Sequence, residues 1–159
     1  MEPANIVELI ERVMRGDPWH GSNITTILEG LAPEAAARRP LRGAHSIWEL
    51  VLHMTGWARE VTGRLGGRAA QEPEAGDWPD IGEPTADRWR AAQAALFSAH
   101  DELIAAVRRL DPALLGRPVI DFRDNAMGTG LSQYVTLHGI IHHTVYHSGQ
   151  IAMLKRTLG

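Results

Sequence analysis

The chain contains no cysteine, which excludes disulfide bonds, thiolate nucleophiles and cysteine-ligated zinc. It has no apolar run approaching the roughly 20 residues of a membrane-spanning helix. Its acidic start, MEPANIVELIERVMRG, lacks the basic segment and apolar run of a signal peptide. The net charge of −3 offers no basic surface for nucleic acid. We therefore expect a cytoplasmic protein without membrane or nucleic-acid partners, in which any bound metal is held by His, Asp or Glu.

What the chain does have is helical patterning. Its 159 residues and 44% apolar content suit a single domain, residues 1–159, with one hydrophobic core. A Ser46 cap with Glu49 three residues later marks one helix start clearly. Apolar residues at helical spacing predict four long segments: Pro3–Arg15, resuming after GDP as Trp19–Leu31 in one kinked helix; Ser46 to a Gly66-Gly67 stop; Thr85–Leu110; and Leu131–Leu158.

Long connections separate these helices. Residues Arg68–Pro84 are rich in Pro, Gly and acidic residues, and Asp111–Gly130 is a second irregular link with a short extended piece expected at Pro118–Phe122. No series of alternating strands interrupts the helical pattern. These features predict an all-α fold, an up-down four-helix bundle with long inter-helix connections. Connections of this length are often functional or cover a site.

Four of the chain's eight histidines fall within the segment HGIIHHTVYHSGQIAMLKR, residues 138–156. At about 100° per residue, His143 and His147 lie about 40° apart on the last helix. They share one stripe with apolar residues, namely Ile140, Ile151, Leu154 and Leu158. His138 and His142 lie on nearly the opposite side, where we expect contact with solvent or an interface.

The helix that begins near Ser46 places a third histidine on its apolar face. His53 lies within about 80° of Leu50, Trp57 and Val61. Residues four apart on a helix can grip one ion, and a facing helix can supply the third ligand, leaving an open position as in catalytic zinc sites. The alternative is that each ring is a core histidine hydrogen-bonded to ordinary neighbours, since an HxxxH spacing also arises by chance in a His-rich segment.

Two stretches resemble the DinB/YfiT-like superfamily: SIWELVLHMTGW, residues 46–57, and HHTVYHSGQIAML, residues 142–154. The early stretch WHGSNITTILEGLAPEAAARRP also fits its pattern, so the similarity extends over most of the chain. The resemblance implies a four-helix bundle, commonly a homodimer, with a divalent metal held by three histidines. Here these residues are His53, His143 and His147. In relatives the metal is often zinc or nickel.

The resemblance leaves the reaction open. Some relatives are S-transferases or isomerases that use low-molecular-weight thiols such as bacillithiol or mycothiol, and others have no assigned activity. We expect a metal-dependent enzyme, either a thiol-dependent S-transferase or a hydrolase that uses metal-activated water. The alternative is a stress-response protein that binds a metal or ligand without turnover. A small-molecule substrate is expected only for the enzyme.

Three further residues are candidates around the metal. Gln150 is placed to hydrogen-bond a ligand imidazole or a metal-bound water, although a helix-helix contact beside Gly149 also accounts for it. Tyr146 is placed to donate to a substrate or to be anchored by its hydroxyl. Trp57 is expected to form a wall of the metal pocket.

No general base stands out. Glu60 is the nearest carboxylate on its helix face, although it lies far along the axis, and Glu29 and Glu49 are weaker candidates. The remaining histidines are expected to be solvated or at an interface; they are His20, His45 and His100. His20 is the strongest exception because it borders the kink beside Trp19.

Overall fold

The computed structural model describes residues 2–123 and 130–158. Its long helices are α1 (Glu2–Met14), α4 (Ile47–Leu65), α5 (Ala86–Arg109) and α6 (Gln133–Leu158). Three short helices lie in the connections: α2 (Ile24–Leu28), α3 (Pro33–Ala37) and the 3-10 helix η1 (Pro112–Leu114). Within the described ranges there is no strand, only an isolated bridge between Pro118 and Ser132. The predicted all-α bundle with long connections is confirmed.

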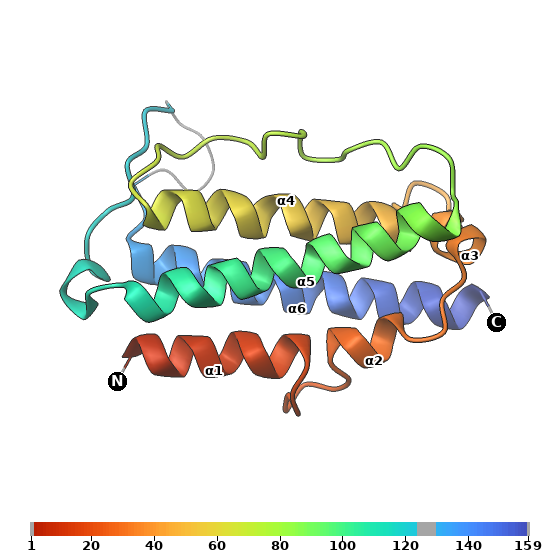
Figure 1. The fold of residues 1–159 in the computed structure, drawn as a ribbon, viewed down its shortest axis with the longest axis horizontal. Helices are drawn as coiled ribbons and strands as arrows, with labels where there is room; N and C mark the ends of the chain where they lie inside the picture. Colours follow the sequence, from red (N-terminus) through yellow and green to blue (C-terminus); the bar gives the residue numbers. More distant parts are fainter. Residues whose placement is uncertain (1, 124–129, 159) are drawn as a thin grey trace.

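The direction of the helices explains one long connection. Helices α1 and α6 run one way along the bundle, and α4 and α5 run the other way (Figure 1). The ion pair between Arg15 and Asp101 joins the residue that directly follows α1 to the second half of α5. Because α4 and α5 are parallel, the chain after α4 must return along the bundle before α5 begins. Gln71 therefore contacts Glu60, whereas Asp77, later in the connection, contacts His53, earlier in α4.

The start of α4 is set by local sequence. The Ser46 hydroxyl accepts the Glu49 backbone N–H, and the Glu49 carboxylate accepts the Ser46 backbone N–H at 2.7 Å, as the capping-box pattern predicts. Burial raises the pKa of Glu49, but hydrogen bonds from Arg39 and Ser46 outweigh it and lower this pKa to about 2. The helix ends before Gly66 and Gly67, the latter with a φ of 90° that favours glycine.

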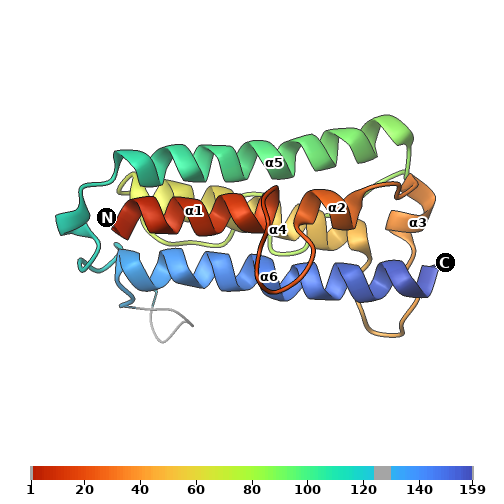
Figure 2. The ribbon, with the colours of Figure 1, turned by 90° about the horizontal axis from the view of Figure 1, so that it is seen from below.

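The second predicted helical segment is shorter than expected. The prediction of a helix from Trp19 was wrong, because α2 begins only after Asn23. The Asn23 side chain accepts the Thr26 N–H and donates to the Gly16 carbonyl, so it both caps α2 and holds the preceding loop. Trp19 is fully exposed on that loop. Helices α1 and α2 still follow one another along one side of the bundle (Figure 2).

The second irregular link is partly described. A short extended piece lies where it was expected, since the Val119 N–H donates to the Leu131 carbonyl beside the Pro118 bridge. Residues 124–129 of the link lie outside the described residues. The core between the long helices includes the tilted ring pair of Trp48 and Trp89, 5.0 Å apart. None of the described helices combines the length and apolarity that crossing a bilayer requires.

Candidate metal centre

Three histidine rings meet between α4 and α6. His53 on α4 and His143 on α6 approach through their Nε2 atoms at 2.8 Å, and the His147 Nε2 lies 3.1 Å from the same His143 nitrogen. One ligand atom from each residue lies within 4.8 Å of the other two. The one-turn spacing of His143 and His147 puts both rings on the face of α6 that meets α4.

The hydrogen bonds of the Nδ1 atoms define the tautomers of His53 and His147. The His53 Nδ1 lies 2.8 Å from the Asp77 carbonyl oxygen, and the His147 Nδ1 lies 2.6 Å from Gln150 Oε1. Neither oxygen carries a proton, so each Nδ1 is the donor. In the neutral rings, both Nε2 atoms then present lone pairs toward His143.

This arrangement has more lone pairs than protons. A single proton on the His143 Nε2 can satisfy one facing lone pair but not both. The His143 Nδ1 is itself buried and has no hydrogen-bond partner among the described residues. A cation at the meeting point of the three nitrogens satisfies all of them, and an all-imidazole donor set suits zinc, copper, iron or nickel. The residues therefore fit a divalent metal.

The surroundings keep the His143 and His147 rings uncharged. Burial lowers the pKa of His143 to about 3, and the neighbouring His147 and His53 add to the effect. Burial also lowers the pKa of His147, against the opposing effect of its hydrogen bond to Gln150. Both rings are therefore neutral at pH 7, the state in which an imidazole binds a metal.

The connection between α4 and α5 supplies one side of the cluster. Besides its carbonyl contact, Asp77 places its carboxylate Oδ1 3.2 Å from the His53 Nδ1 and accepts the Trp57 indole N–H at 2.7 Å. One loop residue thus binds two residues of α4 that lie one turn apart. The Trp57 ring centre is 6.3 Å from those of His53 and His143, so Trp57 lies beside the cluster.

Trp78 is held between two histidines. Its ring stacks on His53 with centroids 4.0 Å apart and on His45 with centroids 3.5 Å apart, both nearly parallel. Asp77 and Trp78 were missed by the sequence analysis. The length of the connection was the available signal, but nothing in its periodicity marks these two residues.

A surface pocket of about 470 Å³ adjoins the cluster. His147 and Gln150 line one wall, Trp78 and His45 line another, and Tyr146 and Met153 lie at the side of α6. Tyr146 is 65% exposed and its ring centre lies 5.1 Å from that of His147. All three accessory candidates, Gln150, Tyr146 and Trp57, are therefore close to the histidines. Their roles toward a metal or substrate stay predictions.

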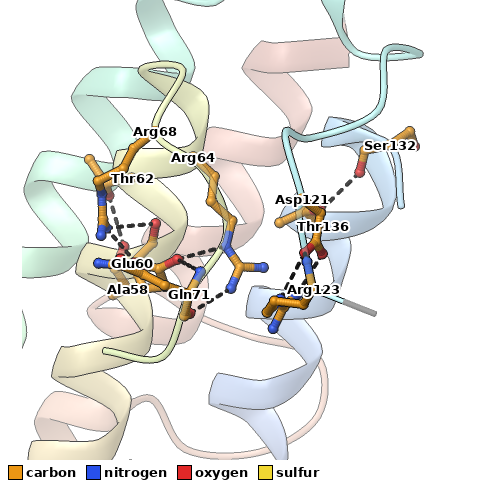
Figure 3. A network of polar contacts seen from close by, with 10 residues as sticks. All are labelled: Ala58, Glu60, Thr62, Arg64, Arg68, Gln71, Asp121, Arg123, Ser132 and Thr136. Atoms are coloured by element: carbon orange, nitrogen blue, oxygen red, sulfur yellow. Dashed lines mark hydrogen bonds and ion pairs between the residues drawn. The ribbon is translucent and has the colours of Figure 1, made fainter. Parts of the chain in front are cut away.

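The carboxylate candidates lie elsewhere or are already engaged. Glu60 is buried and paired with Arg64 and Arg68, and its Oε1 also accepts the Gln71 backbone N–H at 2.9 Å (Figure 3). It thus anchors the start of the return connection to α4. Glu49 is occupied by the helix cap and Arg39, and Glu29 is an exposed residue after α2.

The other histidines divide into two groups. His20 and His142 are exposed, and His138 is partly buried beside Tyr134. The expectation for His100 was wrong: it is 1% exposed inside the core, with Nδ1 donating to the Leu96 carbonyl at 2.9 Å. Burial lowers its pKa, so it is a neutral core histidine. His45, by contrast, is partly exposed, and its ring stacks on Trp78.

A family model described as the DinB superfamily matches residues 19–151. The chain belongs to the DinB superfamily. This match confirms the resemblance seen in the sequence, and it contains all three clustered histidines together with Gln150, whereas α1 precedes it. Comparison with curated proteins and with solved structures finds no match. The DinB assignment thus supports the fold and a metal-binding histidine cluster, and it names no reaction.

Proposed function

We propose that His53, His143 and His147 bind one divalent ion, zinc or nickel, and that this DinB-superfamily protein is a metal-dependent enzyme. The convergence of the three Nε2 atoms carries the proposal. The Asp77 carbonyl and Gln150 Oε1 support it, because metal-bound histidines usually donate their other N–H to an oxygen. Three protein ligands leave a coordination position for a substrate or water.

A thiol-dependent S-transferase fits the surroundings best. A divalent ion in this position would lower the pKa of a water or thiol toward neutrality. Hydrolysis also needs a group that moves a proton. Among the described residues, the carboxylate that contacts the histidine cluster is that of Asp77, and it already accepts the Trp57 indole N–H. An external low-molecular-weight thiol needs neither a protein base nor a protein cysteine, and the chain has no cysteine.

Metal content tests the first part. We expect the purified protein to hold about one zinc or nickel per chain by elemental analysis, and His143→Ala to hold far less. His142→Ala is the matched control, since His142 is the adjacent histidine and is exposed. Equal metal content in His143→Ala and His142→Ala would remove the proposed site.

Turnover tests the second part. The protein is loaded with zinc or, separately, with nickel. Each form is incubated with an electrophile such as monochlorobimane together with glutathione, bacillithiol, mycothiol or no thiol. A rate above background with one thiol, lost in His143→Ala and kept in His142→Ala, supports the transferase. Background rates throughout, with full metal content, would instead favour metal or ligand binding without turnover. We further propose a cytoplasmic homodimer; a monomer mass in light scattering would contradict the dimer.

A further inference from the structure

The pocket beside His147 differs in character from the other surface hollows. Its lining contains no Lys, Arg, Asp or Glu among the described residues. The walls are aliphatic, thioether and aromatic, and their polar side-chain groups belong to His45, His147, Gln150 and the Tyr146 hydroxyl. The hollow between α1 and α5, by contrast, is lined by alternating ion pairs such as Arg15–Asp101 and Arg108–Glu11. The hollow along the outer side of α4 contains Arg59, Glu60 and Arg68.

Large apolar side chains surround this pocket while remaining in contact with water. Tyr146 and Met153, on α6, are 65% and 63% exposed, and Leu41 is 45% exposed. Trp78 is held at the opposite wall by its stacking between two histidines. Exposed apolar side chains gathered around a concave surface are typical of a binding site. The volume of about 470 Å³ is in the ordinary range for a small-molecule site.

Gln150 limits the polar chemistry that the pocket offers. Its Oε1 already accepts the His147 N–H at 2.6 Å, which leaves the NH₂ group of this lining side chain to donate to a ligand. An anionic ligand would lose hydration in this pocket without meeting a cationic side chain, and a cationic ligand would lose hydration without meeting a carboxylate.

We propose that this pocket binds the uncharged, mainly apolar body of a small molecule that carries a hydrogen-bond acceptor. The inference deepens the proposed function, because the pocket shares His147 with the histidine cluster and so places the molecule's acceptor end next to it. The substrate class is then a neutral apolar electrophile rather than a carboxylate or phosphate ester.

Two fluorescent probes with the same ring system test the charge preference. N-phenyl-1-naphthylamine is uncharged, and 8-anilinonaphthalene-1-sulfonate carries an added sulfonate. We expect the full-length protein, with its metal removed by a chelator, to bind the uncharged probe at least about tenfold more tightly, because no cationic side chain lines this pocket. Met153→Arg should reverse the order by weakening the uncharged probe and strengthening the sulfonate.

Controls separate this pocket from other apolar surface. Leu9→Arg makes the same change at an exposed leucine on α1 that does not line the pocket, and it should leave both affinities unchanged. Tyr146→Arg places the cation on a second lining residue and should reproduce the reversal if Met153→Arg does not fold. Equal affinity for both probes in the unsubstituted protein, or the same behaviour in Leu9→Arg as in the pocket variants, would overturn the inference.

The same titrations distinguish this inference from the proposed function. Probe binding is measured with the metal content known, and again in His143→Ala. A charge-selective pocket in a protein that holds no metal would refute the metal centre and keep the pocket. Full metal content without charge selectivity would refute the pocket and keep the metal centre.

Discussion

Replacing Gln150 by leucine should weaken metal binding while leaving the bundle folded. Gln150 Oε1 accepts the His147 Nδ1–H at 2.6 Å, and His147 is itself buried. When a metal occupies the His147 Nε2, the ring proton must stay on Nδ1. In the metal-free protein the proton can move to Nε2, toward His143. The loss of the acceptor therefore affects the metal-bound form more than the free form.

The size of the effect follows from two independent considerations. A buried N–H left without a partner costs about 1–3 kcal/mol. Loss of an oxygen that orients a metal-bound histidine typically lowers affinity about 10–100-fold, or about 1.4–2.7 kcal/mol. The two ranges agree, so we expect the zinc affinity of Gln150→Leu to fall by one to two orders of magnitude.

The assay is a competition for zinc between the protein and a chromogenic chelator. Gln150→Glu is the matched control, since it keeps an oxygen acceptor at the same reach and should retain most of the affinity. Tyr146→Phe controls for a change at a neighbouring residue that lines the pocket. If Gln150→Leu binds zinc within twofold of the unsubstituted protein, the hydrogen bond does not orient a metal ligand.

Three further predictions address the scaffold. Trp57→Phe removes the donor to the Asp77 carboxylate. The free energy of unfolding should fall by about 1 kcal/mol, and limited proteolysis should cut the α4–α5 connection faster. Unchanged proteolysis would show that this hydrogen bond does not hold the connection. Glu49→Gln should destabilise the protein by about 1 kcal/mol at neutral pH after allowance for solvent screening. Because the folded pKa of Glu49 is lowered to about 2, the difference from the unsubstituted protein in denaturant titrations should persist above about pH 4.5 and vanish toward pH 2; a constant difference would contradict this. Leu96→Ala, at a fully buried position on α5, should cost about 2–5 kcal/mol by thermal unfolding, and a loss below 1 kcal/mol would mean that the core there is loosely packed.

Helical periodicity predicted the part of the site that lies on helices. The faces of α4 and α6 could be calculated from sequence spacing alone, and the structure brings His53, His143 and His147 together on those faces. The same reasoning was available for His100, which lies four residues after Leu96 and three before Leu103 on the buried side of α5. Its burial was not predicted because the apolar face that contains Leu96 and Leu103 was not taken to include His100.

The parts that escaped prediction lie in the connections. A connection has no fixed period, so its path depends on where the helices it joins end and begin. The contacts of Asp77 and Trp78 follow from the parallel directions of α4 and α5, which the sequence does not encode locally. The late start of α2 had a local signal in Asn23, a strong N-cap residue. The single-domain prediction for residues 1–159 stays a prediction, as does the role of the histidines as metal ligands.

The connection between α4 and α5 and the long helices contribute to this protein in different ways. All four long helices carry core residues, and α4 and α6 also carry the clustered histidines. These residues constrain one another through close packing, so a substitution at one affects its neighbours. Asp77 and Trp78 instead belong to the connection between α4 and α5, in which Ile81 packs against the core cluster. New side chains can therefore be introduced in this stretch to alter what surrounds His53, with the helical framework left intact, and an engineer seeking a different chemistry would begin there.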